Sequence, residues 1–514
     1  MEENKSVIRT DMFGRMDIYA TNDDINADNV KAELNSAIPY HIKNMLQEDF
    51  LYWYRRGVQP ILSRTKEVRE DILNKVPVNL AYSIVDFKNG YFLQKPVFYT
   101  ARRKGMQTKL KQLNEYLYRS GKGDADNEVA DWFHTVGKGV LFVEPSDEEG
   151  VPFKTYALDP RSAFVVYSLR PGNKPVMGVN MVVNDSTAMF DVFTETQVFH
   201  LTGSATGRMI STEKNHNFLA TAVELVSVEP NVLGKIPIIE YRYNTVNMGS
   251  FEPAISVLDE INNIYSNACD GIEQFIQSLA VAVNCEFEEG TTLSDIRKAG
   301  FIQFRSVGEN KASFTVLSEQ LDQTQTKVLL DSLYDEVLRV CAMPSRAERG
   351  SSTYDTTGAA VLANFGYVQA DSAMLNTWDL YKKSNKQFDD IITEILKRKG
   401  LMDISVADFE PNLDHSEQSN VQSKAQAFQT LMSAGMHPEL AAAKSGISND
   451  PVKDMKMSEK WLEMIWGNPE EKAKEVKQAD KTGNLQEEET ASKGEAEIIE
   501  EDRITEENGT GGNV

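Results

Sequence analysis

Residues Pro253–Val283 read PAISVLDEINNIYSNACDGIEQFIQSLAVAV, and this stretch decides the fold. Its apolar side chains recur every three or four residues, which predicts one amphipathic helix. At about 1.5 Å of rise per residue, that helix is a rod of roughly 45 Å. A narrow apolar stripe on so long a rod buries little surface within one chain, so we expect a subunit that its neighbours complete. The stripe consists of Ile255, Leu258, Ile261, Tyr265, Ala268, Ile272, Phe275 and Leu279.

Two further long helices are expected downstream. Residues Leu321–Cys341 repeat the helical spacing, with charged residues between the apolar ones. Residues Thr356–Lys399 predict a longer helix, roughly 65 Å if it is unbroken. A compact α/β insert separates the first helix from the second, and a polar loop separates the second from the third.

The chain before Phe251 combines short helices with strands. Residues 1–30 look weakly ordered. From Gly137 to Tyr243 apolar residues alternate with polar ones, which predicts a run of short antiparallel strands. Before that block, Pro39 suits the first position of a helix and Gly90 suits the end of one. The expected helices are Pro39–Leu46, Ser63–Leu73, Val78–Asn89, Lys104–Arg119 and Asp124–Thr135, and a short strand is expected at Lys95–Ala101.

The chain after Phe409 predicts short helices followed by an acidic tail. The helices are expected at Ser416–Met432, His437–Ala443 and Ser458–Trp466. Residues Asn468–Val514 carry fourteen Asp and Glu against six Lys and Arg and contain no aromatic residue. This composition predicts a disordered tail.

The charge balance limits the possible functions. The chain has 77 Asp and Glu against 54 Lys and Arg, a formal net charge of −23. A protein that reads DNA sequence needs a basic face that displaces counterions from phosphates, so this class is disfavoured. An acidic surface is compatible with a protein past which DNA slides, because it repels phosphates. Most acidic proteins, however, are simply soluble.

The cysteines and the apolar runs indicate the compartment. Only Cys269, Cys285 and Cys341 occur, without CxxC or Cys/His spacing, so neither a zinc site nor a disulfide scaffold is supported. A reducing compartment fits best. The N-terminal residues are polar, and no run of eighteen apolar residues exists. We therefore expect an intracellular, soluble protein.

No catalytic motif emerges from the sequence. There is no GxxxxGK[ST], HExxH or GxSxG, and the six histidines never pair at ligand spacing. The glycines of Gly137–Val140 and Gly203–Arg208 are interpreted as strand-edge turns. The sequence predicts no catalytic residue, no metal site and no cofactor.

One loop has a conditional functional interpretation. Residues Met343–Gly358 read MPSRAERGSSTYDTTG, with Glu348 between Arg346 and Arg349. Such a loop is ordinarily a solvated connection between helices. If subunits form a ring with this loop inside, its two arginines would contact the phosphates of passing DNA.

Four ordered segments carry a resemblance to a known family. They are YRRGVQPILSR (Tyr54–Arg64), NKVPVNLAYSIVDFKNGYFLQKPVFY (Asn74–Tyr99), ALDPRSAFVVYS (Ala157–Ser168) and PNVLGKIPIIEYRYNTVNMGSFEPAISVLDEINNIYS (Pro230–Ser266). Together they resemble the portal proteins of tailed bacteriophages, in the siphovirus branch whose members infect Gram-positive bacteria. The resemblance covers most of residues 45–400. The first 35 residues and the chain after Phe409 share only a general helical character with the family.

The resemblance implies an α+β, mainly α portal fold, assembled as a ring. Within it, the clip would carry strands at Gly300–Arg305 and Ser313–Leu317, and Gly366 would mark a kink in the long helix. The implied divisions are an N-terminal arm (1–35), a wing of helices and antiparallel strands (36–252), stem helix 1 (253–283), a clip (284–319), stem helix 2 (320–342), a tunnel loop (343–355), a long kinked wing helix (356–400), a crown (401–467) and the acidic tail (468–514).

The resemblance also implies three sets of functional residues. The first is a tunnel loop that contacts DNA, the second is a set of stem residues at the channel or the subunit interface, and the third is a clip that docks other proteins. The tunnel-loop set is Ser345, Arg346, Glu348, Arg349, Ser351, Ser352, Thr353 and Tyr354; the stem set is Asp322, Lys327, Asp331, Asp335 and Arg339; the clip set is Glu288, Asp295, Arg297, Lys298 and Arg305.

The implied function is that of a channel for double-stranded DNA at one capsid vertex. A ring, usually of twelve subunits, would admit the genome during packaging and release it at ejection. Its partners would be the terminase large subunit, a head-completion or adaptor protein, the major capsid and scaffolding proteins, and DNA without sequence specificity, with no membrane. It would reside in the virion, and in the host cytoplasm during assembly.

Two other classes stay open from the residues alone. A packaging enzyme of the terminase ATPase or nuclease type would need a phosphate-binding loop, which the sequence lacks. A helical scaffold protein would need sustained heptads with charged flanks, whereas these helices break and adjoin a block of strands.

Overall fold

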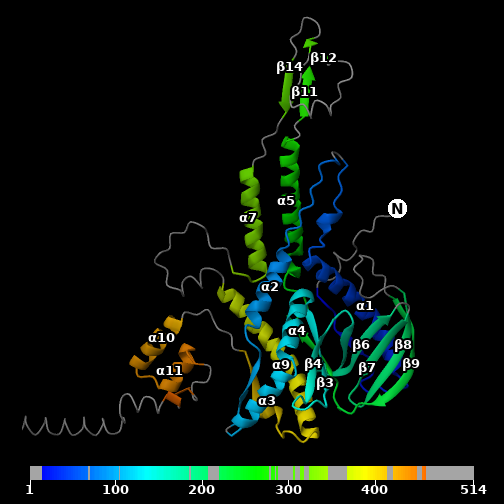
Figure 1. Cartoon of the computed structure of the whole chain (residues 1–514), viewed down its shortest axis with the longest axis vertical. Coiled ribbons are helices and arrows are strands. Elements are labelled where there is room, and N and C mark those ends of the chain that lie inside the picture. Colours follow the sequence, from blue (N-terminus) through cyan, green and yellow to red (C-terminus); the bar gives the residue numbers. More distant parts are fainter. Residues whose placement is uncertain are drawn as a thin grey trace, which may run out of the picture. The chain divides into compact units, whose positions relative to one another are not determined.

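Two sheets hold the strands predicted between Gly137 and Tyr243, and helices make up most of the remaining described chain (Figure 1). The fold is therefore α+β and mainly α, as predicted. The chain forms two units, one up to Ser416 and one from Glu417. The computed structural model describes residues 14–67, 70–103, 105–184, 187–206, 219–276, 279–283, 285–286, 305–306, 313–317, 323–344, 367–413, 421–448, 454–455 and 457–458.

The larger sheet has six strands, and helix α1 (Val30–Arg55) covers one of its faces. Val30, Leu34 and Ile38 of α1 share a core with the inward side chains of the strands. Neighbouring strands are antiparallel except β1, which runs parallel to β5. The strand order is β1 (Ile18–Ala20), β5 (Ala163–Ser168), β6 (Pro175–Asn184), β7 (Thr187–Phe193), β8 (Gln197–Thr206) and β9 (Leu219–Pro230).

The smaller sheet is packed among helices. Its order is β10 (Ile238–Arg242), β3 (Lys138–Pro145) and β4 (Phe153–Leu158). Its inward residues share one core with four helices and with the pair β2–β15. The helices are α2 (Leu80–Phe92), α3 (Gln107–Arg119), α4 (Lys122–Val136) and α9 (Tyr367–Arg398), and the paired strands are β2 (Phe98–Ala101) and β15 (Phe409–Asn412), the latter preceded by the 3-10 turn η4 (Val406–Asp408).

Several local predictions upstream are wrong. Pro39 does not begin a helix but lies inside α1, where burial of Leu34 and Ile38 outweighs the hydrogen bond that proline cannot donate. Gly90 does not end its helix, because α2 continues to Phe92. Among the described residues of Ser63–Leu73, only Ser63 is in a helical turn, η2 (Pro60–Ser63).

The chain from residue 14 onward is also better ordered than expected. The Arg15 guanidinium is fully buried and forms an ion pair with Glu252, which precedes α5 (Ile255–Ile276) in the 3-10 turn η3 (Glu252–Ala254). Arg15 also donates to the carbonyl oxygen of Val136 at 3.1 Å. The preceding Gly14 has φ +87°, and a Cβ there would lie 2.1 Å from the carbonyl oxygen of Val246. The N-terminal segment therefore joins the end of α4 to the base of α5.

Helices α5 and α7 (Gln323–Val340) lie side by side in Figure 1. The first helix is shorter than predicted, because residues Leu279–Val283 form strand β11. That strand pairs antiparallel with β14 (Ser313–Leu317), so strand pairing replaces the last helical turn. Cys285–Glu286 (β12) pairs with Arg305–Ser306 (β13). The strand predicted at Ser313–Leu317 is confirmed.

The second unit contains two short helices in its described part. They are α10 (Val421–Ser433) and α11 (Pro438–Ser445). His437 caps α11, and Gly446 ends it in the left-handed conformation with φ +64°. The predicted kink at Gly366, the helix at Ser458–Trp466 beyond its first residue, and the tail lie outside the described residues.

An extended segment, Asn74–Val78, is bonded along α5 by alternate backbone groups. The N–H groups of residues 74, 76 and 78 donate to side chains that α5 presents at every fourth position. Two extended residues advance about 6.6 Å and four helical residues advance about 6.0 Å, so the two repeats match. The three bonds are Asn74 to Asp270 Oδ1 at 2.7 Å, Val76 to Ser266 Oγ at 3.0 Å and Val78 to Asn262 Oδ1 at 2.7 Å.

Further polar contacts reinforce this ladder. Asn262 and Ser266 are fully buried, and Asn262 Nδ2 also donates to Gln59 Oε1 at 2.6 Å. Although burial opposes the charged form of Asp270, hydrogen bonds from Lys66 and Asn74 hold its pKa below the ordinary value. The ion pairs of Arg64 and Lys66 with Asp270 and the three backbone bonds hold this part of the chain along α5 in a non-helical conformation.

Asn262→Leu is expected to lower the unfolding free energy by about 2–4 kcal/mol. The substitution leaves the Val78 N–H and the side-chain Oε1 of Gln59 without the hydrogen-bond partner that Asn262 provides. Thermal unfolding of this variant measures the effect, and Asn263→Leu at the neighbouring exposed position is the matched control. Equal unfolding midpoints for the two variants would contradict the role of the ladder.

Candidate functional site

Helix α7 has three distinct flanks, and the first packs on α5. Leu330, Tyr334, Val337 and Cys341 are buried and share a core with Leu258 and Ile261. The rings of Tyr334 and Tyr265 meet edge to face with centroids 6.5 Å apart. This flank is satisfied within the chain.

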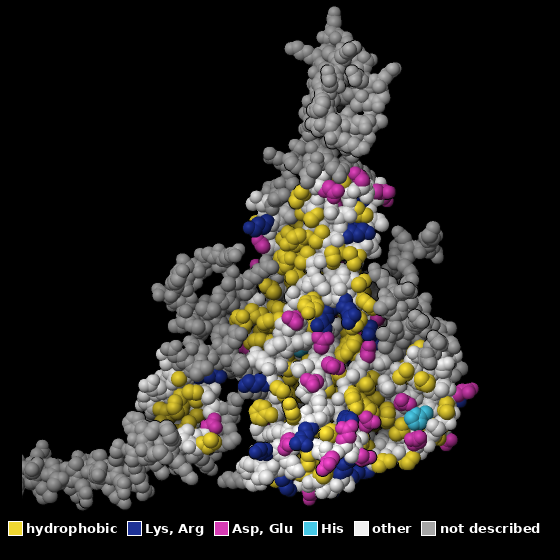
Figure 2. Space-filling model, viewed as in Figure 1, with side chains coloured by type: hydrophobic (Ala, Val, Ile, Leu, Met, Phe, Trp, Pro, Cys, Tyr) yellow, Lys and Arg dark blue, Asp and Glu magenta, His cyan; other side chains and the backbone are white. Residues whose placement is uncertain are grey.

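The second flank of α7 is apolar and exposed. Leu329, Leu333 and Val340 follow at steps of four and seven residues, which keeps them on one side of a helix. Leu329 is 51% exposed and Val340 is 39% exposed, while Leu333 is half-buried. Apolar side chains gather over α5 and α7 in Figure 2. An exposed apolar strip on a packed helix is typical of a protein interface.

The third flank carries the predicted stem residues. Lys327, Asp331, Asp335 and Arg339 are all exposed and follow one another at four-residue steps. Arg339 is bonded to Glu336, and this hydrogen bond lowers the pKa of Glu336. The structure thus brings four of the five predicted stem residues onto one charged flank, whereas Asp322 lies outside the described residues.

The other predicted site residues, except Arg305, lie outside the described residues. The whole tunnel-loop set, Ser345 to Tyr354, lies outside the described residues. Of the clip set, Arg305 lies in β13, and Glu288, Asp295, Arg297 and Lys298 lie outside the described ranges. Their roles stay predictions.

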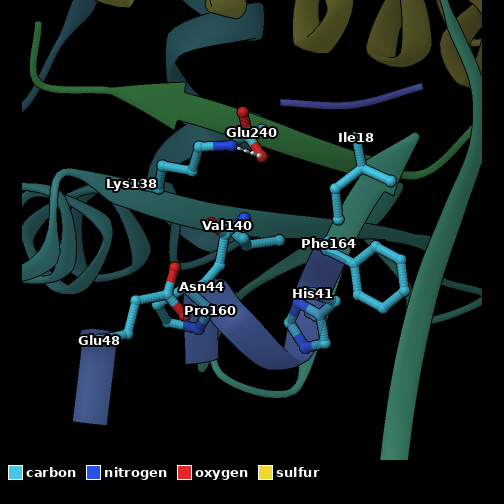
Figure 3. Close-up of a pocket in the computed structure, with 10 residues that line it drawn as sticks. Ile18, His41, Asn44, Glu48, Lys138, Val140, Pro160, Phe164 and Glu240 are labelled. Carbon is cyan, nitrogen blue, oxygen red and sulfur yellow. Dashed lines mark hydrogen bonds and ion pairs between the residues drawn. The ribbon is translucent and has the colours of Figure 1, made fainter. Parts of the chain in front are cut away.

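A small cavity lies where α1 meets strands β1, β3, β5 and β10. Figure 3 shows His41, Asn44 and Glu48 of α1 around it, opposite Lys138 and Glu240. Its volume is about 10 Å³, which leaves room for about one water molecule and excludes an organic ligand. Lys138 Nζ lies 3.1 Å from Glu240 Oε2, so these two charges compensate each other.

Two titratable side chains of α1 are shifted at this cavity. Burial lowers the pKa of His41 to about 4, and its ring stacks on Phe164 with centroids 4.1 Å apart. The neutral ring donates from Nε2 to the carbonyl oxygen of Arg161 at 3.0 Å. Burial raises the pKa of Glu48 to about 8, and its Oε2 has no hydrogen-bond partner among the described residues. Glu48 is therefore protonated at neutral pH. No local sequence pattern indicates a buried acid at this position.

A second hollow, of about 570 Å³, is an open groove between α1, α2 and α4. Tyr52 and Trp132 stack in it with ring centroids 5.5 Å apart. The guanidinium groups of Arg56 and Arg161 lie 4.4 Å and 4.1 Å from the Tyr52 ring. Tyr52 and Trp132 thus contact each other, and both guanidinium groups contact the Tyr52 ring.

The helices and side chains of the described residues meet the requirements neither of a membrane-spanning helix nor of a metal site. Every helix in these ranges is too short or too polar to cross a bilayer. The same ranges contain no group of three or more His, Cys, Asp and Glu placed to hold a metal ion.

Comparisons with known proteins give one decisive match. The family model described as phage portal protein, SPP1 Gp6-like, matches residues 33–474. No curated protein matches the chain. Among solved structures, the neck of an empty GTA particle computed with C6 symmetry has 12% identity, covering 73% of this chain and 91% of that chain, with a TM-score of 0.40. The neck of a native GTA particle computed with C12 symmetry has 13% identity, 71% and 89% coverage, and a TM-score of 0.40.

Glu48→Gln tests the buried acid. The unfolded carboxyl ionises above about pH 4.5 and the folded one only above about pH 8, so the wild type loses stability as pH rises between these values. The neutral variant does not lose stability in this way. The amount by which its unfolding free energy exceeds that of the wild type should therefore be about 2–4 kcal/mol larger at pH 8 than at pH 5. Thermal unfolding across this range measures it, with the exposed Glu128→Gln as control. A difference that does not change with pH would contradict the assignment.

Proposed function

The chain belongs to the SPP1 Gp6-like family of phage portal proteins, and on this premise we propose that it assembles as a closed ring of twelve copies at one capsid vertex. Through the ring, double-stranded DNA enters during packaging and leaves at ejection. The observation that carries the proposal is the exposed apolar flank of α7, Leu329, Leu333 and Val340.

Ring closure explains why this flank is left uncovered. In a ring each subunit presents two different surfaces, and each surface meets the other kind on the next copy. Helix α7 already covers α5 with one flank, so its apolar flank is available to a second copy. The third flank, with Lys327, Asp331 and Asp335, is then suited to water or to the channel.

The charge of the chain fits a channel that does not hold DNA tightly. A net charge of −23 repels phosphates, so few contacts need to break as DNA moves. The tunnel loop would add a few basic contacts to the backbone from Arg346 and Arg349, without reading bases. We assign the clip, residues 284–319, to docking of the terminase large subunit and of an adaptor. The capsid and scaffolding proteins would contact the rest of the ring.

The energy for DNA movement would come from another chain. The sequence has no phosphate-binding loop, and the family is a structural one. In this proposal the protein is a virion component and not an enzyme.

Leu329→Glu is expected to abolish ring formation. It buries an unpaired carboxylate in the apolar contact, so the fraction of rings should fall at least roughly tenfold. Val328→Glu is the matched control, because it makes the same change at an adjacent exposed residue on the side of Asp331 and Asp335. Native mass spectrometry measures the oligomer. Rings of equal abundance in both variants, or a stable wild-type monomer, would argue against the proposal.

Replacing Arg346 and Arg349 together by Ala tests the tunnel loop. Rings should form normally, because neither residue belongs to the proposed α7 contact, whereas DNA packaging or retention should fall. The length of DNA recovered from assembled particles is the readout. An unchanged packaged length would refute the assignment of this loop to the channel.

A further inference from the structure

Helix α2 contacts the end of α7 and the start of α9 from one helical turn. Lys88 and Tyr91 are three residues apart, so they project from the same side of α2. Lys88 reaches the second residue after α7 ends, and Tyr91 reaches the first turns of α9. The chain between these two helices, residues 341–366, contains the tunnel loop of the proposed function.

The α7 contact is made at a defined helix end. Ala342 has φ +49°, a left-handed conformation, and its N–H donates to the Arg339 oxygen at 3.3 Å. The N–H of Met343 donates to the Leu338 oxygen at 2.8 Å, which completes the usual two-bond termination of a helix. Lys88 is buried, and its Nζ donates to the Ala342 oxygen at 2.9 Å. A cation at this position also stabilises the negative end of the helix dipole.

The α9 contact lies just inside its first turns. The Tyr91 hydroxyl donates to Asp371 Oδ1, and the Tyr91 ring stacks on Phe87 with centroids 5.1 Å apart. Gln369 Nε2 donates to the Arg339 oxygen at 3.4 Å, so the two helix ends also touch directly. Both ends of the connection are thus held within a small region beside α2.

We propose that α2 is a brace that fixes where α7 ends and where α9 begins, with Lys88 and Tyr91 as positioning residues for the loop that joins them. The brace itself follows from contacts among described residues. Its consequence for DNA rests on the proposed function, in which that loop faces the channel.

The charge state of Lys88 gives a measurable signal that a purely structural role would not produce. Burial lowers the pKa of Lys88 to about 8, and the titratable groups that face it are Cys341, directly after α7, and His134 on α4. Burial raises the pKa of Cys341 to about 12 and keeps His134 neutral, so neither changes charge near pH 8. The charge on Lys88 is present below about pH 8 and is lost above it.

Hydrogen exchange on the full-length protein tests the brace. Lys88→Met should speed exchange, relative to the wild type, in peptides covering 338–344 by roughly tenfold, the loss expected for one charge-assisted hydrogen bond. Tyr91→Phe should do so in peptides covering 367–375. The matched controls are Lys111→Met and Tyr82→Phe, which make the same changes at exposed positions of α3 and α2. Exchange equal to that of the controls would overturn the proposal.

A pH series keeps the test independent of whether a variant folds well. After correction for intrinsic exchange, protection of residues 341–343 in the wild type should rise as pH rises from 7 to 9. Opening of this helix end exposes Lys88 to water and restores its ordinary pKa, so above about pH 8 the closed state releases a proton that the open state keeps. In Lys88→Met it should not depend on pH. A flat profile in the wild type would overturn the role of the Lys88 charge. Native mass spectrometry of the same samples separates the two hypotheses: faster exchange in a protein that forms no rings supports the brace and counts against the proposed function.

Discussion

The packing around α5 depends on a match between two repeat lengths. Every second residue of the segment Asn74–Val78 directs its N–H toward α5. Every fourth residue of α5 accepts one of these bonds with a side-chain oxygen, at Asn262, Ser266 and Asp270. Two extended residues advance about 6.6 Å and four helical residues about 6.0 Å, so three successive bonds can form. One flank of α5 is thereby occupied by its own chain, and α7 occupies another. Within the part of the chain that the structure describes, the apolar flank of α7 stays exposed.

The sequence was sufficient for the elements that carry a clear period. The strands of residues 137–243 follow from the alternation of apolar side chains, and the returning helix follows from their helical spacing, whereas the strand at Ser313–Leu317 was implied by the family resemblance. The predicted helix at Ser63–Leu73 was wrong because the ion pairs of Arg64 and Lys66 with Asp270, about 200 residues away, are not visible in a local pattern. The same reason applies to the N-terminal segment, where one short strand and one buried arginine pair with distant partners. In the predicted first helix, apolar residues 279–283 fit a helix and a strand equally well, and pairing with β14 decided for the strand.

The candidate site shows a similar division. Helical spacing placed Lys327, Asp331, Asp335 and Arg339 together in advance, because four-residue steps share a flank regardless of the fold. Leu329 and Val340 belong to the apolar repeat predicted for Leu321–Cys341. Only the burial of each side chain shows which residues of that repeat α5 covers and which stay exposed. Buried polar groups were missed altogether. Glu48, Asn262 and Ser266 are hydrophilic residues that a sequence pattern assigns to the surface, and each is held inside by a partner or a cavity from elsewhere in the chain.

The ladder and the brace are parts of one continuous connection. Residue 78 makes the last rung on α5, and Asn79 then caps α2 by accepting a bond from the Tyr82 N–H. The same Asn79 donates to the Arg55 oxygen at the end of α1. The start of α2 is therefore fixed against both α1 and α5, and its position sets where Lys88 and Tyr91 meet the ends of α7 and α9. A displacement of α5 by a neighbouring copy would reach these two contacts through rigid, hydrogen-bonded elements. The α7 flank that we propose as the subunit contact and the two helix ends on either side of residues 341–366 are thus linked through contacts within each chain.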